Sequence, residues 1–351
     1  RKTAAAVCIS HSGCATIRIV EFFERGGEAR VVTFYNTIDD KLVEISGPEK
    51  GCWVWMVHPD DAEVQRIAEL TGAEPEMLRA PLDPEERARI ESEDGVSLIL
   101  VDIPTIEMEG KDFVYSTIPL GIVKTAEHLI TVCLKDSHIM RDFALGRVKG
   151  FFTNKRTRFI LQILYRNASR YLQYLRQIDK KTNAIENELQ KTLRNNELMQ
   201  LMRLEKSLVF FATSLKSNEI VLEKLLRSDL IRRFPDDEDL LEDVIIENKQ
   251  AIEMCAIYRD ILSSTMDAFS SVINNNVNDI MKVLTSLTLV LSIPTLIASI
   301  WGMNVAVPFE GSSVGFWVLL GVSLLASVVS IIILSRRKIA LTHLFPYAKY
   351  A

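Results

Sequence analysis

The sequence predicts an α+β membrane protein with an N-terminal α/β domain, a long helical hairpin, a stalk helix and two C-terminal transmembrane helices. Three observations lead to this class. Charged residues are dense up to about residue 270 and then nearly vanish. Two apolar runs of about 20 residues follow, each long enough to cross a hydrocarbon core of about 30 Å. Before them, strand-like runs are followed by apolar residues at helical spacing.

The first segment, residues 1–155, is expected to be a cytoplasmic α/β domain. Runs rich in Val, Ile and aromatic residues predict strands at residues 16–23, 52–57, 96–104, 117–124 and 128–134. Pro59 and the acids after it predict a helix through Leu70, and Pro75 begins a second, shorter helix. The segment has no Gly-rich phosphate loop and no catalytic grouping of Ser, His, Asp or Cys. We therefore expect neither an enzyme nor a nucleotide or organic cofactor.

Residues 156–234 are expected to form a long antiparallel helical hairpin in the cytoplasm. Apolar residues recur there at helical spacing among Lys, Arg, Glu and Gln, which is typical of amphipathic helices. Asn195 and Asn196 are the expected turn between the two helices. A hairpin with this many charges is usually structural, and we assign it no binding role.

A stalk helix is expected over residues 235–301. Pro235 is followed by the acidic run 236–239, and proline and acidic residues are both favoured in the first turn of a helix. No Pro or Gly follows before Pro294, so one helix is predicted to continue into the membrane, over on the order of 95 Å. Such a helix would connect an acidic tip mechanically to a membrane span, which suits a gate controlled from inside the cell.

The two membrane spans are predicted at residues 281–301 and 314–334, joined by the short outer loop 302–313. The tail, residues 335–351, begins with a basic run, whereas the loop contains no Lys or Arg. Positive charge marks the cytoplasmic side of a membrane protein. We therefore expect a multi-pass protein of the cell (inner) membrane, in contact with membrane lipid, with both termini in the cytoplasm.

One face of the first span carries hydroxyl groups. They recur at spacings of 3, 4, 3 and 4 residues, which places them on one side of a helix: Thr285, Thr288, Ser292, Thr295 and Ser299. Asn278 and Met281 extend this stripe toward the cytoplasm. Ser and Thr can also bond their own helix carbonyls or assist helix packing, but the regularity of the stripe favours a water-facing wall. Two helices are too few to enclose a pore, so a pore requires several copies around an axis.

The composition excludes some partners and compartments. With 41 basic and 46 acidic residues, the chain lacks the basic surplus of a nucleic-acid-binding protein. The five cysteines are odd in number and scattered, so we expect reduced thiols on the cytoplasmic side rather than a disulfide framework. The first residues lack an initiator Met and a long apolar core, and no signal peptide is expected there.

The first span ends in the tripeptide Gly302-Met303-Asn304. A Gly-Met-Asn tripeptide that closes the first of two C-terminal spans, with a short loop and a basic tail, resembles the CorA family of magnesium channels. The resemblance is strongest over residues 274–338, where the run 281–285 and Pro294-Thr295 also fit, and by layout it covers the whole chain. It implies a funnel-shaped homopentamer in which the first spans line the pore, the second spans surround it, and divalent cations, Mg²⁺ first, are the substrate.

The resemblance also assigns roles to individual residues of the pore. Gly302, Met303 and Asn304 would form the outer mouth, where Asn304 presents an amide oxygen from each subunit to the waters of a hydrated ion. Mg²⁺ gives up its waters reluctantly, so binding the hydrated ion avoids that cost. Glu310 in the outer loop would raise the local cation concentration, although a lone loop acid is more often simply solvated.

Below the mouth, the polar path would continue along the first span. Three apolar residues there are candidates for constrictions that close by dewetting: Met281, Leu284 and Leu291. Ordinary packing is the alternative for each, and it is preferred for Leu291. The expected pore-lining residues are Asn278, Met281, Leu284, Thr285, Thr288, Ser292, Thr295 and Ser299.

In the CorA family, intracellular Mg²⁺ between neighbouring cytoplasmic domains holds the pore shut, so the resemblance implies Mg²⁺ as a regulatory ligand too. Asp243 of the stalk matches one acid of that site. The partner acid aligns with Ala80, preceded by a basic residue, which departs from the family pattern. Either Asp83 or Glu85 substitutes for it, or the regulatory site is weaker or lies elsewhere. The acidic run 236–239 is a second candidate, although such a run is usually a helix cap and a solvated face.

Two other functions stay open. A related transporter could move Co²⁺, Ni²⁺ or Zn²⁺, but zinc-type relatives usually carry Val in place of the Met of Gly-Met-Asn, and no His/Cys cluster offers soft ligands. A membrane-anchored coiled-coil scaffold without transport would explain the hairpin and stalk but not the hydroxyl stripe or the tripeptide. Ion flux separates the transporters from the scaffold. Because no nucleotide site is apparent, flux is expected to follow the gradient and the membrane potential.

Overall fold

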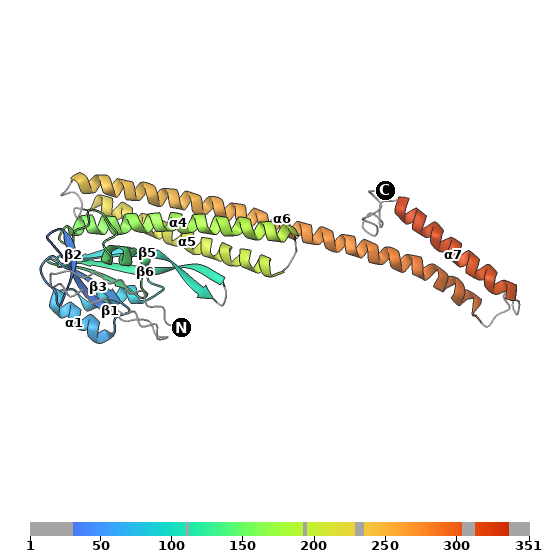
Figure 1. The fold of residues 1–351 in the computed structure, drawn as a ribbon, viewed down its shortest axis with the longest axis horizontal. Helices are drawn as coiled ribbons and strands as arrows, with labels where there is room; N and C mark the ends of the chain where they lie inside the picture. The colour runs from blue at the N-terminus through green and yellow to red at the C-terminus, as the bar shows by residue number, and fades with distance from the viewer. Residues whose placement is uncertain (1–30, 110–111, 192–194, 229–234, 304–312, 337–351) are drawn as a thin grey trace, which may run out of the picture. The chain divides into compact units, whose positions relative to one another are not determined.

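The computed structural model describes residues 31–109, 112–191, 195–228, 235–303 and 313–336 of the 351-residue chain (Figure 1). The chain divides into two compact units. The first consists of Arg1–Asp102, Ile118–Ile163 and Lys224–Glu238, and the second of Ile103–Thr117, Leu164–Glu223 and Asp239–Ala351. Two strands and three helices therefore contribute residues to both units.

Seven strands form one sheet in the order β2-β1-β3-β7-β6-β5-β4. The strands are β1 (Val31–Ile38), β2 (Lys41–Ile45), β3 (Trp53–Val57), β4 (Arg89–Glu93), β5 (Val96–Glu109), β6 (Asp112–Lys124) and β7 (Leu129–Cys133). β3 and β7 are parallel neighbours, with Val54 opposite Ile130, and all residues of both strands are buried. Continuous apolar runs are what a strand covered on both faces requires.

Four of the five predicted strands are confirmed. Residues 52–57 and 128–134 correspond to β3 and β7. Residues 96–104 lie within the longer strand β5, and residues 117–124 lie within the longer strand β6. The strand predicted at residues 16–23 lies outside the described residues. The prediction omits β1, β2 and β4. β2 and β4 are the two edge strands and expose most of their side chains, so they lack the apolar alternation that identifies a strand.

Helix α1 (Asp61–Thr71) in the first unit is confirmed, and its ends are set by local chemistry. Asp60 Oδ1 accepts a hydrogen bond of 2.8 Å from the Glu63 amide, and Glu63 Oε2 accepts one of 2.9 Å from the Asp60 amide. This reciprocal capping box satisfies two amides that the first turn leaves free. The helix ends at Gly72, whose φ of 68° is a left-handed conformation that glycine adopts without strain.

Short helices also belong to the first unit: α2 (Pro75–Arg79), which the sequence predicts, the 3₁₀ helix η1 (Ala80–Leu82) and α3 (His138–Ala144). The start of the long helix α4 (Arg156–Lys191) is held by aromatic packing. The Phe159 ring lies edge-on to Trp53 at 5.3 Å between centroids and 4.4 Å from the Phe151 ring. These contacts fix the beginning of α4 against the buried strand β3.

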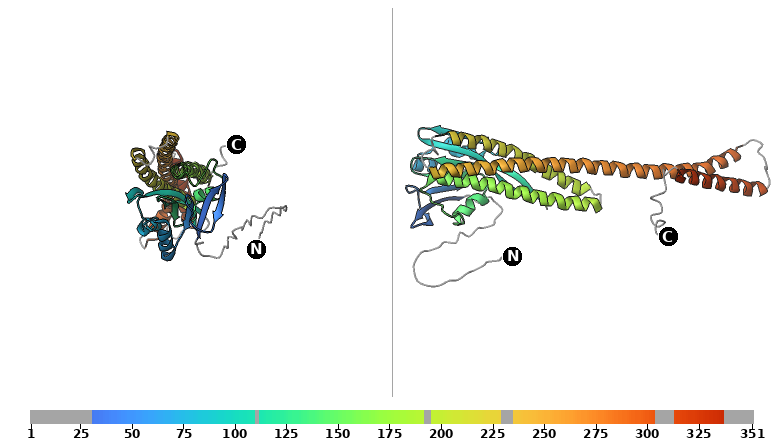
Figure 2. Two further views of the ribbon diagram at one scale, coloured as in Figure 1. Left: turned by 90° about the vertical axis from the view of Figure 1, so that its left-hand side faces the viewer. Right: turned by 90° about the horizontal axis from the view of Figure 1, so that it is seen from above.

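The second unit contains most of α4, α5 (Asn195–Arg227) and α6 (Pro235–Trp301), together with α7 (Ser313–Arg336). α4, α5 and α6 lie side by side in both views (Figures 1 and 2) and share one core, which includes Leu175, Leu208 and Cys255. The predicted helical hairpin is thus α4 and α5. The predicted turn at Asn195 and Asn196 was wrong, because these residues begin α5. Asparagine is favoured at helix N-termini, where its side chain can satisfy free amides.

The far ends of β5 and β6 belong to the helical core of the second unit. Tyr115 of β6 donates a hydrogen bond of 3.2 Å to Gln177 Oε1 of α4, and its ring lies edge-on to Phe211 of α5. Ser214 of α5 donates a hydrogen bond of 3.0 Å to Thr117 Oγ1. The strand pair is therefore anchored on both helices of the hairpin.

Candidate functional site

Two helices of the second unit are long and apolar enough to cross a membrane. They are α6, over Asp236–Trp301, and α7, over Val314–Leu334. Only 6% of the most apolar 18-residue window of each helix is buried within the chain. A core helix of a soluble protein would be mostly buried, whereas an apolar surface of this length requires a cover such as lipid. The two predicted membrane spans are therefore supported.

α6 is one helix of 67 residues, which corresponds to roughly 100 Å at 1.5 Å per residue. Pro294 lies inside the helix without ending it. Since proline has no amide hydrogen, the carbonyl of Val290 lacks its usual helical donor there. The prediction of a single helix from the acidic start to the membrane span is confirmed.

The hydroxyl stripe lies on an exposed face of α6. Its members are Thr285, Thr288, Ser292, Thr295 and Ser299, all exposed. Three of them donate hydrogen bonds of 2.9 Å to carbonyls of their own helix, at Leu284, Leu289 and Leu291. Hydrogen bonding of the hydroxyls to their own helix, the alternative to a water-facing wall, is therefore present for these three residues. Each hydroxyl oxygen still keeps acceptor lone pairs, which water or the hydration shell of an ion can use.

The remaining predicted pore residues lie on the same helix. Asn278 is exposed, and Met281 and Leu284 are 54% and 56% exposed. Leu291, for which packing is the preferred interpretation, is 59% exposed, so the described part of this chain does not cover it. A cover for these side chains comes from lipid or from another chain.

α6 ends at the predicted mouth. The Gly302 amide donates a hydrogen bond of 3.0 Å to the Ala298 carbonyl, and Met303 follows with its side chain exposed. A Cβ added to Gly302 would lie 3.4 Å from that carbonyl oxygen, at the edge of ordinary contact. Asn304 and Glu310 lie outside the described residues.

The acids predicted for a regulatory site belong to different units. Asp83 is exposed in the first unit, where its carboxylate accepts a hydrogen bond of 2.9 Å from the Glu85 amide, and Asp243 is exposed on α6 in the second. Among the residues that the structure describes, no three His, Cys, Asp or Glu side chains gather closely enough to hold a metal ion. Arg79, the basic residue before Ala80, forms an ion pair of 3.0 Å with Asp61. Arg79 is thus accommodated by an ion pair within the first unit.

The acidic run 236–239 is partly committed to the fold of the first unit. Asp237 is 5% exposed, and its carboxylate lies 3.8 Å from the guanidinium of Arg158. Burial raises the pKa of Asp237 above its ordinary value, and the positive charge of Arg158 offsets this only in part. The acids also lie at the positive end of the helix dipole. This agrees with the interpretation of the run as a helix start.

The described cysteines are structural. Cys52, Cys133 and Cys255 are buried and form no disulfide. Burial raises the pKa of Cys133 to about 12 and that of Cys255 to about 11. Cys52 Sγ lies 3.4 Å from His128 Nδ1, but burial raises the pKa of Cys52 and lowers the pKa of His128. A reactive thiolate–imidazolium pair is therefore disfavoured.

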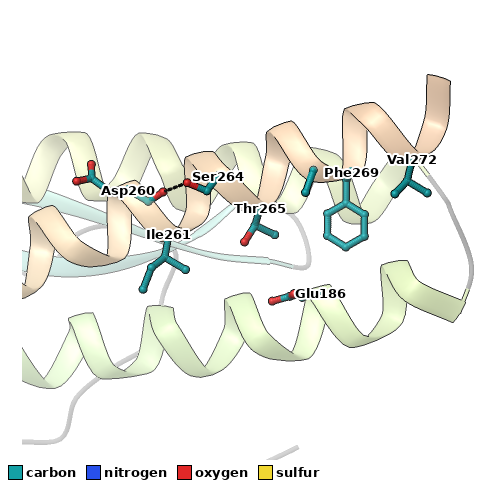
Figure 3. A pocket seen from close by; sticks show the side chains of 8 residues that line it. Glu186, Asp260, Ile261, Ser264, Thr265, Phe269 and Val272 are labelled. Carbon is teal, nitrogen blue, oxygen red and sulfur yellow. Dashed lines mark hydrogen bonds between the residues drawn. The ribbon is translucent and has the colours of Figure 1, made fainter. Parts of the chain in front are cut away.

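A groove in the second unit was not predicted from the sequence. It has a volume of about 630 Å³ and lies between α4 and α6 (Figure 3). Glu186 lines it from α4, and Ile261, Ala268 and Val272 line it from α6. A signal for it exists in the sequence, because these apolar residues do not fall on the face of α6 that carries the core residues. Most of the surface that lines this groove is apolar.

A family model described as "CorA-like Mg2+ transporter protein" matches residues 48–337 of this chain. Two curated relatives each bear the name cobalt/magnesium transport protein CorA. The one from Methanocaldococcus jannaschii is 27% identical over 310 residues, which cover 85% of this chain and 95% of the relative. The one from Thermotoga maritima is 25% identical over 260 residues, or 71% of each chain.

Solved structures share the architecture. The complete CorA magnesium transporter of M. jannaschii matches with a TM-score of 0.74 and 24% identity, over 87% of this chain and 98% of that one. The full-length CmaX protein matches with a TM-score of 0.63 and 17% identity, over 89% and 100% of the two chains. Because both identities are below 25%, these likenesses establish the fold alone, and the predicted fold class is confirmed.

Proposed function

This chain belongs to the family of CorA-like Mg²⁺ transporter proteins, and we propose that it conducts Mg²⁺ into the cell through a homopentameric pore lined by α6. Members of this family are ion transporters, so the prediction that the chain is not an enzyme is confirmed. The driving force is the ion gradient together with the membrane potential. A potential of 100 mV contributes about 2.3 kcal/mol for each elementary charge moved inward, or twice that for a divalent ion.

The observation that carries the proposal is the exposed polar stripe on one unbroken helix. Hydroxyls at spacings of 3 and 4 residues lie on a single side of α6, in a segment otherwise apolar enough for lipid. A polar face is costly against hydrocarbon, because its groups find fewer partners there than in water. Several copies that turn this face toward a common axis would enclose a wet path and leave the apolar faces to lipid and α7.

The mouth of this pore would be formed by Gly302, Met303 and Asn304. In the proposed homopentamer, five Asn304 amide oxygens accept hydrogen bonds from the waters of a hydrated Mg²⁺, so that the ion is selected before it loses them. Gly302 permits close approach of the backbone at this point, and Glu310 raises the local cation concentration. Both termini then lie in the cytoplasm of a cell-membrane protein, on the side of the basic tail.

Intracellular Mg²⁺ is the proposed regulatory ligand. Asp243 on α6 and Asp83 in the first unit are both exposed and therefore available to a cation bound between subunits. α6 supports this role, since the helix that carries Asp243 is the same helix that forms the membrane span. Ion occupancy near its start can thus be transmitted to the pore as a rigid-body movement.

The two curated relatives are named for cobalt as well as magnesium. We therefore propose Co²⁺ as a second substrate of the same pore. If the two ions share one path, Co²⁺ slows the entry of Mg²⁺ by competition. If they use separate paths, the rate of Mg²⁺ entry does not change when Co²⁺ is added.

The test is Mg²⁺ entry into liposomes that contain the purified full-length protein, measured with an internal indicator under an inside-negative potential. Wild-type protein is expected to give rapid entry, and Asn304→Ala is expected to abolish it while the oligomer stays intact. Entry that survives the substitution would remove Asn304 as the selecting group. No wild-type entry, even with internal Mg²⁺ chelated, would contradict the magnesium proposal itself.

A further inference from the structure

The groove between α4 and α6 has an apolar wall on its α6 side. Ile261 is 50% exposed and Val272 is 43% exposed, and Phe269 lies between them, 7% exposed. Together with Thr265, these residues recur at spacings of 4, 4 and 3, so they share one face of the helix. Figure 3 shows all four side chains on the side of α6 that faces α4. Hydrocarbon surface of this kind suits the apolar part of a small ligand.

Thr265 places a free hydroxyl in this wall. Serines nearby on the same helix, Ser264, Ser270 and Ser271, each donate a hydrogen bond of 2.9 or 3.0 Å to the carbonyl four residues earlier. Thr265 is partly buried, and within the described part of the chain its hydroxyl makes no hydrogen bond. The hydroxyl is therefore available to a molecule in the groove.

Glu186 supplies an unpaired negative charge from the α4 side. Figure 3 shows its side chain between the two helices. It is partly buried, and it forms no ion pair or hydrogen bond with any described residue. The second acid of the groove, Asp260, is paired instead with Arg259 at 3.4 Å. A carboxylate beside hydrocarbon loses part of its hydration, and a cation that donates a hydrogen bond to it compensates this loss.

The chemistry of the groove suits an organic cation better than a metal ion. Mg²⁺ prefers several oxygen ligands and keeps most of its waters, which find no partners on hydrocarbon. Among the described residues, no three His, Cys, Asp or Glu side chains gather closely enough to hold a metal. An ammonium group has three N–H donors, enough for both Glu186 and Thr265. The groove volume of about 630 Å³ is that of an ordinary small-molecule site.

We propose that the α4–α6 groove binds an organic ammonium ion with an aliphatic chain. The nitrogen donates hydrogen bonds to the Glu186 carboxylate and the Thr265 hydroxyl, and the chain lies on Ile261 and Val272. Such a ligand touches α4 and α6 at once, and α6 continues into the membrane span. Binding itself does not depend on ion conduction, so the site stands or falls separately from the proposed function.

The test is protection of a thiol in the groove of the full-length protein in detergent. Ala268→Cys places the thiol in the groove lining, in a background of Cys8→Ser and Cys14→Ser. Its rate of reaction with a maleimide is measured by mass spectrometry. Hexylammonium is expected to slow the reaction about tenfold at ten times its dissociation constant. Ser270→Cys is the matched control, because this exposed position lies about 200° around the helix from Ala268 and should not be protected.

Matched ligands separate the charge from the chain. Hexanol and hexanoate keep the six-carbon chain without the positive charge, whereas methylammonium keeps the charge without the chain. Each is expected to protect far less than hexylammonium at the same concentration. Mg²⁺ is expected neither to protect the thiol nor to displace hexylammonium.

Matched variants locate the charge. Added to the Ala268→Cys background, Glu186→Gln is expected to raise the dissociation constant of hexylammonium by at least about tenfold, the usual cost of losing a charged hydrogen-bond partner. Thr265→Val is expected to raise it less, because a neutral hydrogen bond is lost. Glu188→Gln changes an exposed acid on the next residue but one of α4 and is expected to leave it unchanged.

Three outcomes would overturn the site. Protection by hexanol or methylammonium equal to that by hexylammonium would show that charge or chain is not recognised. An unchanged dissociation constant in Glu186→Gln would remove the carboxylate as the partner. A thiol at position 268 that reacts as slowly as the buried Cys255 without ligand would show that another chain covers the groove. If liposomes still take up Mg²⁺ in any of these cases, the pore proposal stands.

Discussion

Pro81 packs so closely on Gly121 that a Cβ built on the glycine would overlap the proline Cγ. The contact joins the 3₁₀ helix η1 to strand β6 within the first unit. Real Cβ atoms do not approach carbon this closely, so either the proline or the strand must move when a side chain is added.

Gly121→Ala is therefore expected to lower the free energy of unfolding of the first unit by about 1–3 kcal/mol, the usual cost of overpacking a core. Pulse proteolysis of the full chain in increasing urea measures this change. Gly47→Ala is the control, since no described atom lies within 4 Å of an added Cβ there. Equal stability of the two variants would show that η1 shifts freely and that the contact carries no constraint.

The hydrogen bond between Trp53 and Thr131 predicts a non-additive pair. Trp53 Nε1 donates to Thr131 Oγ1 at 2.8 Å, and both residues are at most 1% exposed. Thr131→Val leaves a buried indole N–H without its acceptor, so we expect a loss of about 1–3 kcal/mol in the free energy of unfolding. Trp53→Phe/Thr131→Val is expected to lose less than the sum of the two single variants. Strict additivity in urea titrations would contradict the coupling.

The hydroxyl stripe predicts an effect on flux that is separate from stability. Thr288 donates only to its own helix, at Leu284, so Thr288→Val is expected to preserve the fold and slow Mg²⁺ entry into liposomes. The matched control is Ser330→Ala on α7, where the serine makes the same kind of bond to Ala326. Equal entry rates for both variants and the wild type would indicate that Thr288 does not face the ion path.

Asp237 predicts a pH-dependent stability. Its pKa is raised in the folded chain, chiefly by burial and despite Arg158. Between the unfolded and folded pKa values the folded chain binds more protons, so its stability falls as pH rises through that window. Asp237→Asn removes the cost of burying the charged form. The variant is expected to have a higher melting temperature at neutral pH, with a gain that shrinks as pH falls below the ordinary carboxyl pKa.

The control for this prediction is Asp239→Asn, which changes an exposed acid of α6 two residues after Asp237. Its melting temperature is expected to differ little from that of the wild type across the same pH range. A melting temperature for Asp237→Asn below that of the wild type at neutral pH would mean that the attraction to Arg158 outweighs the burial of the carboxylate.

The buried thiols are expected to resist alkylation in the native state. Cys133 and Cys255, with pKa values raised to about 12 and about 11, hold almost no thiolate near neutral pH, and both are shielded from reagent. Mass spectrometry after iodoacetamide treatment of a Cys8→Ser/Cys14→Ser variant should find them unmodified until denaturant is added. Modification at the rate of a free thiol would contradict the burial of these residues.

The sequence alone determined the features that depend on neighbours along the chain. Two apolar runs fixed both membrane spans, Pro235 and the acids after it fixed the start of α6, and the absence of breakers before Pro294 fixed its continuity. Hydropathy, helix capping and helical periodicity are all properties of one continuous stretch of sequence, so a single chain displays them without its partners.

Only the tertiary structure decided the features that join distant residues. The edge strands β2 and β4 carry little apolar pattern and are held by pairing with β1 and β5. The burial of Asp237 beside Arg158 and the groove between Glu186 and Ile261 both depend on packing between α4 and α6, which are far apart in the sequence. A local pattern states which side chains share a face, whereas packing decides which of those faces is covered and by what.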